Sequence, residues 1–270
     1  MKLSIAGWSL WRHFRQQEIP ALALVDFAAV VREKFDIDAV ELNSPFFEST
    51  DAGYLRSVVA AADKAGVKLL NIAVDEKGDL SSDDVAARQL GLESYGRWID
   101  VAAAMGIAAI RCNSGGKTIT DKQLGERHCI ESFTRLAERG ANAGVRILIE
   151  NHWGISSDPD VVYRIVTGVR KAVGDQHMAA LPDYGNWPPE VDRYAALERT
   201  LPLAGAVHAK VLEVTEAGGR LEHSAFDLAR CVALTRAAGY DGYLGIEYEG
   251  PAPQFDGVAK AVALMRGLIS

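Results

Sequence analysis

The chain has 270 residues, of which 49% are hydrophobic and 24% charged, so it can bury the large core of a folded globular protein. Its formal net charge of -7 at pH 7 argues against the phosphate backbone of a nucleic acid as the main partner. The sequence lacks an apolar stretch of membrane-spanning length, and residues 1–7 do not resemble a signal peptide. We therefore expect a cytoplasmic protein without a membrane partner.

Eight strand-like apolar runs alternate with eight helix-like segments along the chain. The strand-like runs span residues 3–6, 39–42, 68–73, 108–112, 146–150, 178–181, 204–209 and 243–248. Apolar residues recur at helical spacing in the segments 21–35, 51–65, 83–105, 121–143, 159–173, 190–200, 225–238 and 258–268. Gly66 and Gly144 stand where two of these helices should end, and Asp158-Pro159 is a typical helix start. Eight such units predict a single (β/α)8 TIM barrel domain over residues 1–270.

The three cysteines do not have the spacing of a metal site or of a disulfide framework. Cys112, Cys129 and Cys231 are odd in number and scattered. We expect reduced, buried thiols.

Four polar residues lie at or near the C-terminal ends of strand-like runs in the second half of the chain. They are Glu150, Asp183, His208 and Glu247. TIM barrels place their chemistry at this end of the strands, where three carboxylates would repel one another unless a cation lay between them. Carboxylate oxygens and one imidazole suit a divalent ion. The sequence therefore predicts a metal site.

The segments around these residues resemble the xylose-isomerase-like barrel superfamily of sugar isomerases and epimerases. The likeness rests on Ile149-Glu150-Asn151-His152, Leu181-Pro182-Asp183-Tyr184-Gly185-Asn186, Val207-His208-Ala209-Lys210 and Ile246-Glu247-Tyr248-Glu249-Gly250. It implies that Glu150, Asp183, His208 and Glu247 bind one divalent ion, with Mn²⁺ expected first and Mg²⁺ or Co²⁺ as alternatives. It also implies a small carbohydrate as substrate. The order of the four residues is similar to that of the ketose 3-epimerases.

Two departures separate the chain from the ketose epimerases. Those enzymes carry an arginine shortly after the metal-binding histidine, where this chain has Lys210, and a histidine shortly after the metal-binding aspartate, where it has Asn186. Lys210 and Asn186 at these positions are similar to the broader sugar phosphate isomerase/epimerase branch, which includes inosose dehydratases. We expect Asn186 to contact the substrate, and the sugar itself stays open.

Glu150 and Glu247 are the expected acid and base. A divalent ion can hold a sugar carbonyl and the neighbouring hydroxyl and stabilise a metal-bound enediolate. If the two glutamates lie on opposite faces of the substrate, one removes the carbon-bound proton and the other returns it from the far side, which epimerises that carbon. Return of the proton to the adjacent carbon would interconvert an aldose and a ketose.

Three further polar residues each have two interpretations. Lys210 lies two residues after His208 and faces the same side of the strand, where it either contacts a substrate oxygen or pairs with Glu41 or Glu247. Glu41, at the end of the second strand, is either a contact for a substrate hydroxyl or a buried ion-pair partner. His152 is either a catalytic proton relay or an ordinary hydrogen-bonded loop residue.

Four tryptophans follow strand ends, where flat aromatic faces can line a sugar pocket: Trp8, Trp11, Trp153 and Trp187. Each could instead serve packing. Trp98 lies within a helix and should belong to the core.

The alternative function is a lyase or dehydratase that uses the same enediolate to expel a substituent from a keto-sugar, an inosose or a C-glycoside. It needs a proton donor for the leaving group, for which His152 and Lys210 are the candidates. A repair endonuclease is disfavoured by the acidic charge and by the six histidines, since the endonuclease branch of the superfamily uses additional histidine ligands. A non-catalytic sugar-binding protein would not need the four potential ligands. The apolar flanks of the barrel and the habit of the family allow a homodimer or homotetramer.

Overall fold

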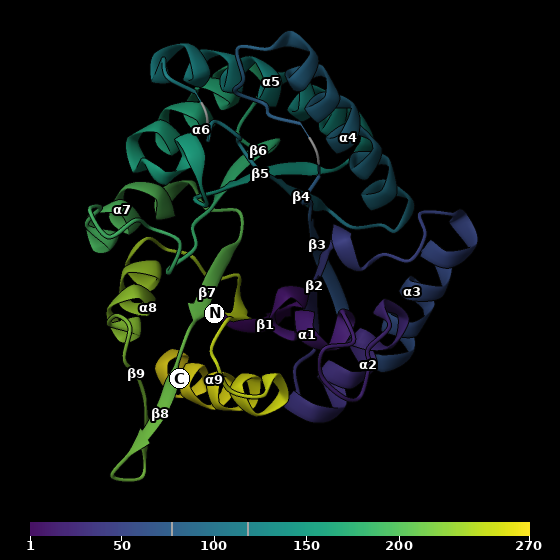
Figure 1. Ribbon diagram of the computed structural model, residues 1–270, viewed down its shortest axis with the longest axis vertical. Helices are drawn as coiled ribbons and strands as arrows, with labels where there is room; N and C mark the ends of the chain where they lie inside the picture. The colour runs from purple at the N-terminus through teal and green to yellow at the C-terminus, as the bar shows by residue number, and fades with distance from the viewer. Residues whose placement is uncertain (77, 118) are drawn as a thin grey trace. The chain divides into compact units, whose positions relative to one another are not determined.

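Eight parallel strands form one sheet in the order β6-β5-β4-β3-β2-β1-β10-β7. The computed structural model describes residues 1–76, 78–117 and 119–270 (Figure 1). The strands are β1 (Lys2–Ala6), β2 (Ala39–Asn43), β3 (Lys68–Ala73), β4 (Ala109–Cys112), β5 (Arg146–Glu150), β6 (Met178–Leu181), β7 (Val207–Val211) and β10 (Tyr243–Tyr248). Strands and helices alternate along the chain, which confirms the predicted (β/α)8 TIM barrel fold.

The helices are α1 (Trp11–Phe14), α2 (Leu24–Phe35), α3 (Ala52–Ala65), α4 (Val85–Ala104), α5 (Lys122–Ala143), α6 (Pro159–Val173), α7 (Arg193–Thr200), α8 (Leu228–Ala237) and α9 (Gln254–Ile269). Helices α2 to α9 follow the predicted segments, and α1 was not predicted. Short 3-10 helices add η1 (Gly7–Leu10), η2 (Ser44–Phe46), η3 (Gly154–Ser157) and η4 (Leu201–Leu203). Gly66 and Gly144 end α3 and α5 with φ of 66° and 72°, as predicted.

Local sequence explains α6 well. The Asp158 side chain accepts from the backbone N–H groups of Asp160 at 2.9 Å and Val161 at 3.3 Å, and Pro159 takes the first helical position. Its buried residues recur at helical spacing: Val161, Val162, Ile165, Val166 and Val169. Each of these side chains contributes about 1.5–3 kcal/mol through burial.

The seventh strand begins later than the predicted range 204–209, because an isolated bridge and a bend at residues 204–206 separate η4 from β7, which starts at Val207. Ala204 forms an isolated parallel bridge with Ala180, and the Gly205 N–H donates to the Ala180 carbonyl at 2.8 Å. His208 is therefore the second residue of β7, and Lys210 lies on the same strand.

An antiparallel hairpin that we did not predict follows β7. It consists of β8 (Val214–Ala217) and β9 (Arg220–His223), which form a separate two-stranded sheet (Figure 1). Gly218 and Gly219 connect the strands with φ of 58° and 76°, the left-handed conformation that a two-residue hairpin turn requires. At its base His223 Nε2 accepts from the Leu212 N–H at 3.2 Å, and Nδ1 lies 3.0 Å from the Phe226 carbonyl oxygen.

The chain forms two compact units. The terminal unit comprises Met1–Leu70 and His208–Ser270, and the central unit comprises Asn71–Val207. In the central unit α4 packs on α5 and α5 on α6, beside the paired strands β4, β5 and β6 (Figure 1). In the terminal unit α9 packs on β1, β10 and α2. That residues 1–270 act as one domain stays a prediction.

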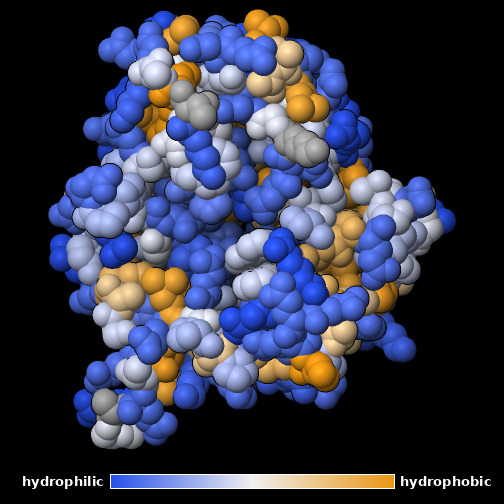
Figure 2. All heavy atoms as spheres, viewed as in Figure 1, coloured by the Kyte–Doolittle hydropathy of each residue, from blue (hydrophilic) through white to orange (hydrophobic). Residues whose placement is uncertain are grey.

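The three cysteines are free and buried, as expected. Burial raises the pKa of the Cys112 and Cys129 thiols well above the ordinary value, which keeps them protonated and unreactive. The face of the molecule drawn in Figure 2 is largely hydrophilic.

Within the described residues, no helix has both the length and the apolar character needed to cross a membrane.

Candidate metal centre

In the central unit, Glu150 ends β5 and Asp183 follows β6. The two strands are paired with Glu150 opposite Leu181, which brings both carboxylates to the same edge of the sheet. Glu150 is 2% exposed and Asp183 is fully buried. The Glu150 carboxylate has a partner on each oxygen, since Arg111 Nε lies 3.2 Å from Oε2 and Asn186 Nδ2 donates to Oε1 at 3.3 Å.

The Asp183-Tyr184-Gly185-Asn186 segment folds around the Asp183 carboxylate. Oδ1 accepts from the backbone N–H groups of Gly185 at 2.6 Å and Asn186 at 2.8 Å. The Asn151 side chain accepts from the Asp183 N–H at 2.7 Å and donates to the Asp183 carbonyl at 3.0 Å. These bonds fix the orientation of the Asp183 carboxylate, and the same turn carries Asn186 to Glu150.

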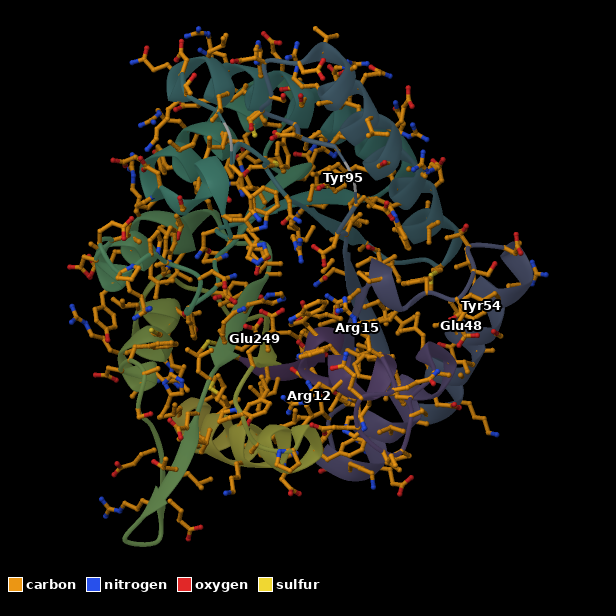
Figure 3. All side chains as sticks on the ribbon, viewed as in Figure 1. Arg12, Arg15, Glu48, Tyr54, Tyr95 and Glu249 are labelled. Carbon is orange, nitrogen blue, oxygen red and sulfur yellow. The ribbon has the colours of Figure 1, made fainter. Side chains whose placement is uncertain are left out.

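Arg111 on β4 is a site residue that the sequence analysis missed. Its side chain is buried, and Nη1 donates to Asp75 Oδ1 at 2.9 Å and to Asn113 Oδ1 at 2.7 Å in addition to the ion pair with Glu150. Asn113 is held in turn by its N–H, which donates to the Tyr95 hydroxyl at 3.0 Å. Tyr95 is labelled in Figure 3. Burial raises the pKa of Tyr95, so this hydroxyl stays neutral. An arginine within a buried strand was the available signal.

In the terminal unit, His208 on β7 lies between two glutamates. Its Nε2 is 3.0 Å from Glu41 Oε2, and its Nδ1 is 3.9 Å from Glu247 Oε2. Ser4 Oγ donates to the other Glu41 oxygen at 2.7 Å. Glu41 is 2% exposed and His208 1%. Glu41 is therefore a buried partner of His208, one of its two interpretations, and any substrate contact by Glu41 stays a prediction.

The contact with Glu41 defines the role of each imidazole nitrogen. A proton on Nε2 donates to the Glu41 carboxylate, which leaves the lone pair of Nδ1 on the side of Glu247. Metal-binding histidines usually hold a carboxylate or carbonyl at the second nitrogen in this way. The His208 environment thus fits a metal ligand through Nδ1.

Lys210 bridges two glutamates of β10 and its following loop. Its Nζ lies 2.7 Å from Glu247 Oε2 and 2.8 Å from Glu249 Oε1. Lys210 is 4% exposed, whereas Glu249 reaches toward solvent (Figure 3). Pairing with Glu247, the alternative to a substrate contact, is therefore present, and the contact with substrate stays a prediction.

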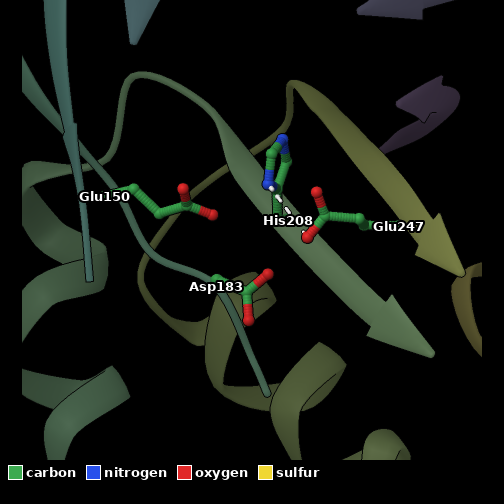
Figure 4. Close-up of side chains that lie close together, drawn as sticks. All are labelled: Glu150, Asp183, His208 and Glu247. Carbon is green, nitrogen blue, oxygen red and sulfur yellow. Dashed lines mark ion pairs between the residues drawn. The ribbon is translucent and has the colours of Figure 1, made fainter. Parts of the chain in front are cut away.

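Glu150, Asp183, His208 and Glu247 make up one group that can hold a metal ion. All four are buried, and each offers one ligand atom within 4.8 Å of the others (Figure 4). Three buried carboxylates would repel one another without a cation, and oxygen donors with one imidazole suit Mn²⁺, Mg²⁺ or Co²⁺. The donor set therefore fits a single divalent ion.

The structure shows the environments of the predicted tryptophans and of His152, and their contacts with substrate stay predictions. The Trp187 side chain is 3% exposed, and its indole N–H has no partner among the described residues. Trp153 lies under the Lys117 ammonium, 4.2 Å from the ring centroid, and His152 lies beside Trp153. Trp8 stacks on Trp11 and on Phe46 in the terminal unit, which gives it a packing role. Trp98 is buried as expected.

Several solved structures share this fold at low sequence identity. A D-psicose 3-epimerase from Clostridium cellulolyticum H10, solved with D-tagatose, gives a TM-score of 0.76 at 15% identity, covering 100% of both chains. The 3-keto-D-glucoside 4-epimerase from E. coli gives 0.74 at 15% identity, over 100% of this chain and 99% of that one. A family 2 AP endonuclease from Brucella melitensis gives a TM-score of 0.69 at 17% identity, covering 96% of this chain and 97% of that one. No curated protein matches the sequence.

The family model described as the xylose isomerase-like TIM barrel matches residues 29–268. This range includes all four potential metal ligands together with Arg111 and Lys210. The chain therefore belongs to the xylose isomerase-like TIM barrel family.

Proposed function

We propose that the chain is a divalent-metal-dependent sugar epimerase or isomerase, with Mn²⁺ as the preferred ion. The observation that carries the proposal is the buried group of Glu150, Asp183, His208 and Glu247. Two structural neighbours, the 3-keto-D-glucoside 4-epimerase and the D-psicose 3-epimerase, support sugars as the substrate class. The endonuclease neighbour is the weaker guide, since a net charge of -7 opposes binding to DNA.

When bound, the ion would withdraw electron density from a substrate carbonyl and the adjacent hydroxyl, which makes the proton on the hydroxyl-bearing carbon acidic. The side chains then have to remove that proton and return it. Glu150 and Glu247 are the acid and base in this proposal, one on each face of the substrate.

Each of the two glutamates already has a buried cationic partner. Arg111 lies 3.2 Å from Glu150 Oε2, and Lys210 lies 2.7 Å from Glu247 Oε2. A neighbouring cation fixes the position of a carboxylate, so both side chains would meet the substrate already oriented. Negative charge that develops on a substrate oxygen would gain from the same two cations.

The surrounding side chains would bind and orient the sugar. Lys210 is proposed to donate to a substrate oxygen and Asn186 to contact a hydroxyl, while Trp153 and Trp187 would line the pocket. Glu41 and Trp8 keep their predicted substrate contacts, although Glu41 supports His208 and Trp8 stacks on Phe46. His152 is proposed as a proton relay.

The second candidate is a lyase or dehydratase acting on a keto-sugar, an inosose or a C-glycoside. The observation that favours it is the buried Lys210 ammonium beside Glu247, because elimination needs a proton donor for the leaving group. Loss of a substituent from the product distinguishes this reaction from epimerisation.

Removal of divalent ions should abolish turnover, and Mn²⁺ should restore it at one ion per chain. Because the ion would bind the group of four ligands that only the folded chain assembles, the loaded protein should also unfold at a higher temperature than the metal-free protein. Elemental analysis, isothermal titration with Mn²⁺ and thermal unfolding measure these effects. Full activity in protein shown to contain no metal would contradict the proposal.

A further inference from the structure

Asn43, the last residue of β2, has an unusual environment for a buried amide. It is 3% exposed, yet its Oδ1 has no hydrogen-bond partner within residues 1–76, 78–117 and 119–270. Most buried side-chain polar atoms in folded proteins are hydrogen-bonded, and an exception calls for an explanation. The sequence analysis did not assign Asn43 a role.

Asn43 belongs to the polar side of the terminal unit. It lies two residues after Glu41 on β2, and Lys210 lies two residues after His208 on β7. Glu249, in the loop directly after β10, lies two residues after Glu247. Residues two apart on a strand face the same side. Strands β2 and β7 therefore each contribute one polar residue to a lower row and one to an upper row that is nearer their C-terminal ends. Glu247 joins the lower row through its contact with His208, and Glu249 joins the upper row through its contact with Lys210.

The two rows differ in how their polar groups are paired. In the lower row, Glu41 contacts His208, and His208 contacts Glu247. In the upper row, Lys210 contacts Glu249 at 2.8 Å, whereas the Asn43 oxygen has no partner in the described part of the chain. The unsatisfied oxygen thus lies in the row nearer the end of the strands at which barrel enzymes bind their substrates.

Gly7 allows the Asn43 oxygen to occupy its position. A Cβ atom at residue 7 would lie 2.7 Å from Asn43 Oδ1 and 3.4 Å from the Glu41 carbonyl oxygen. A side chain there would force the amide to move. The absence of a side chain at Gly7 therefore leaves the room that the Asn43 amide occupies.

We infer that Asn43 is a substrate-binding residue whose side-chain amide exchanges hydrogen bonds with hydroxyl groups of the sugar. An amide offers an acceptor and two donors side by side, which matches hydroxyls on adjacent carbons. A bound hydroxyl would satisfy the oxygen that the protein leaves unpaired. This inference rests on the proposed sugar chemistry and extends it to a position outside the metal group.

The test compares Asn43→Leu with Asn151→Leu. Asn151 is an equally buried amide whose oxygen and nitrogen are both bonded to the Asp183 backbone. Asn43→Leu replaces an unpaired polar group by an apolar one of similar size, so it should leave the thermal unfolding midpoint unchanged or raise it. Asn151→Leu leaves the Asp183 N–H and carbonyl without their hydrogen-bond partner, so it should lower the midpoint. A drop for Asn43→Leu as large as that for Asn151→Leu would overturn the inference.

Sugar binding supplies the second readout, with D-tagatose and D-fructose as probes for the Mn²⁺-loaded protein. The dissociation constant of Asn43→Leu should rise by roughly 3- to 10-fold, the effect of losing one neutral hydrogen bond. Wild-type protein that binds neither ketose would count against the proposed function and the inference together. Wild-type protein that binds, with equal affinity in Asn43→Leu, would overturn the inference alone.

Discussion

Replacing Glu247 by glutamine should nearly abolish turnover while leaving most of the affinity for the divalent ion. Glutamine keeps the size of the side chain and one oxygen, but it cannot take up or release a proton at neutral pH. A positioned acid or base contributes typically 10²–10⁴-fold to rate, so we expect kcat to fall by on the order of 10³-fold. Steady-state kinetics with saturating Mn²⁺, together with a Mn²⁺ titration followed by electron paramagnetic resonance, measures both effects.

Glu249→Gln is the matched control for this prediction. Glu249 contacts the same Lys210 ammonium as Glu247 but lies outside the group of potential ligands and is more exposed. Its loss should alter kcat far less than Glu247→Gln. Full activity in Glu247→Gln would remove Glu247 from the acid–base pair, and complete loss of Mn²⁺ binding would assign it to the metal alone.

Replacing Arg111 by methionine should destabilise the protein strongly. The change leaves the buried carboxylate of Glu150 without its cation, and removal of one partner from a buried ion pair costs about 3–5 kcal/mol. Arg111 also holds Asn113 and Asp75, so the support on one side of Glu150 would be lost as a whole. Urea unfolding measures the free energy, and a Mn²⁺ titration should show weaker binding because Glu150 is no longer fixed.

Arg139→Met provides the comparison, because the Arg139–Asp100 pair is closer, at 2.7 Å against 3.2 Å for Arg111 and Glu150, but is exposed. Pairs of that kind contribute about 0–1 kcal/mol. Arg111→Lys keeps the charge and should recover only part of the loss, because an ammonium cannot reproduce the forked geometry of the guanidinium. If Arg111→Met were no less stable than Arg139→Met, the ion pair between Arg111 and Glu150 would not contribute to the free energy of unfolding.

The potential metal ligands could be predicted because a simple rule places them. Parallel strands bring their C-terminal ends to one edge, so polar residues that end buried strands are expected to lie together. Glu150, Asp183, His208 and Glu247 satisfied that pattern in the sequence and form one group in the structure, although His208 is the second residue of β7 and not its end. The helix stops at Gly66 and Gly144 were readable for an equally local reason, the left-handed conformation of glycine.

The partners of these residues could not be predicted in the same way. Arg111 contacts Glu150 from the neighbouring strand, and Asp75 and Asn113 reach Arg111 from two loops, so the arrangement depends on strand pairing and loop paths. For Glu41 the sequence left two interpretations. That its partner is His208 depends on how side chains of β2 and β7 pack together, which the sequence does not show. The ligands themselves can be read from local sequence, whereas the side chains that hold them in place are set by tertiary contacts.

Two features of the seventh unit show the limits of apolar patterning. The run Leu203-Ala204-Gly205-Ala206-Val207 is apolar enough for a strand, yet its first part forms the end of η4 and an isolated bridge. The β8–β9 hairpin had a readable signal in Gly218-Gly219, a two-residue turn, but it falls where a βα loop was expected. In the first case the length of the apolar run led to a predicted strand that starts too early. In the second, the regular (β/α)8 alternation led us to expect a loop where the hairpin lies.

Proton NMR in deuterated water tests the proposed chemistry most directly. The Mn²⁺-loaded protein would be incubated with a panel of ketoses, keto-glycosides and inososes, the ion removed before spectra are recorded, and a chelator-treated sample run alongside. We predict metal-dependent exchange of one carbon-bound proton for deuterium, together with formation of a stereoisomer or of the aldose–ketose partner. Exchange followed by loss of a substituent would establish the lyase instead, and no exchange in any member of the panel would contradict enediolate chemistry at Glu150 and Glu247.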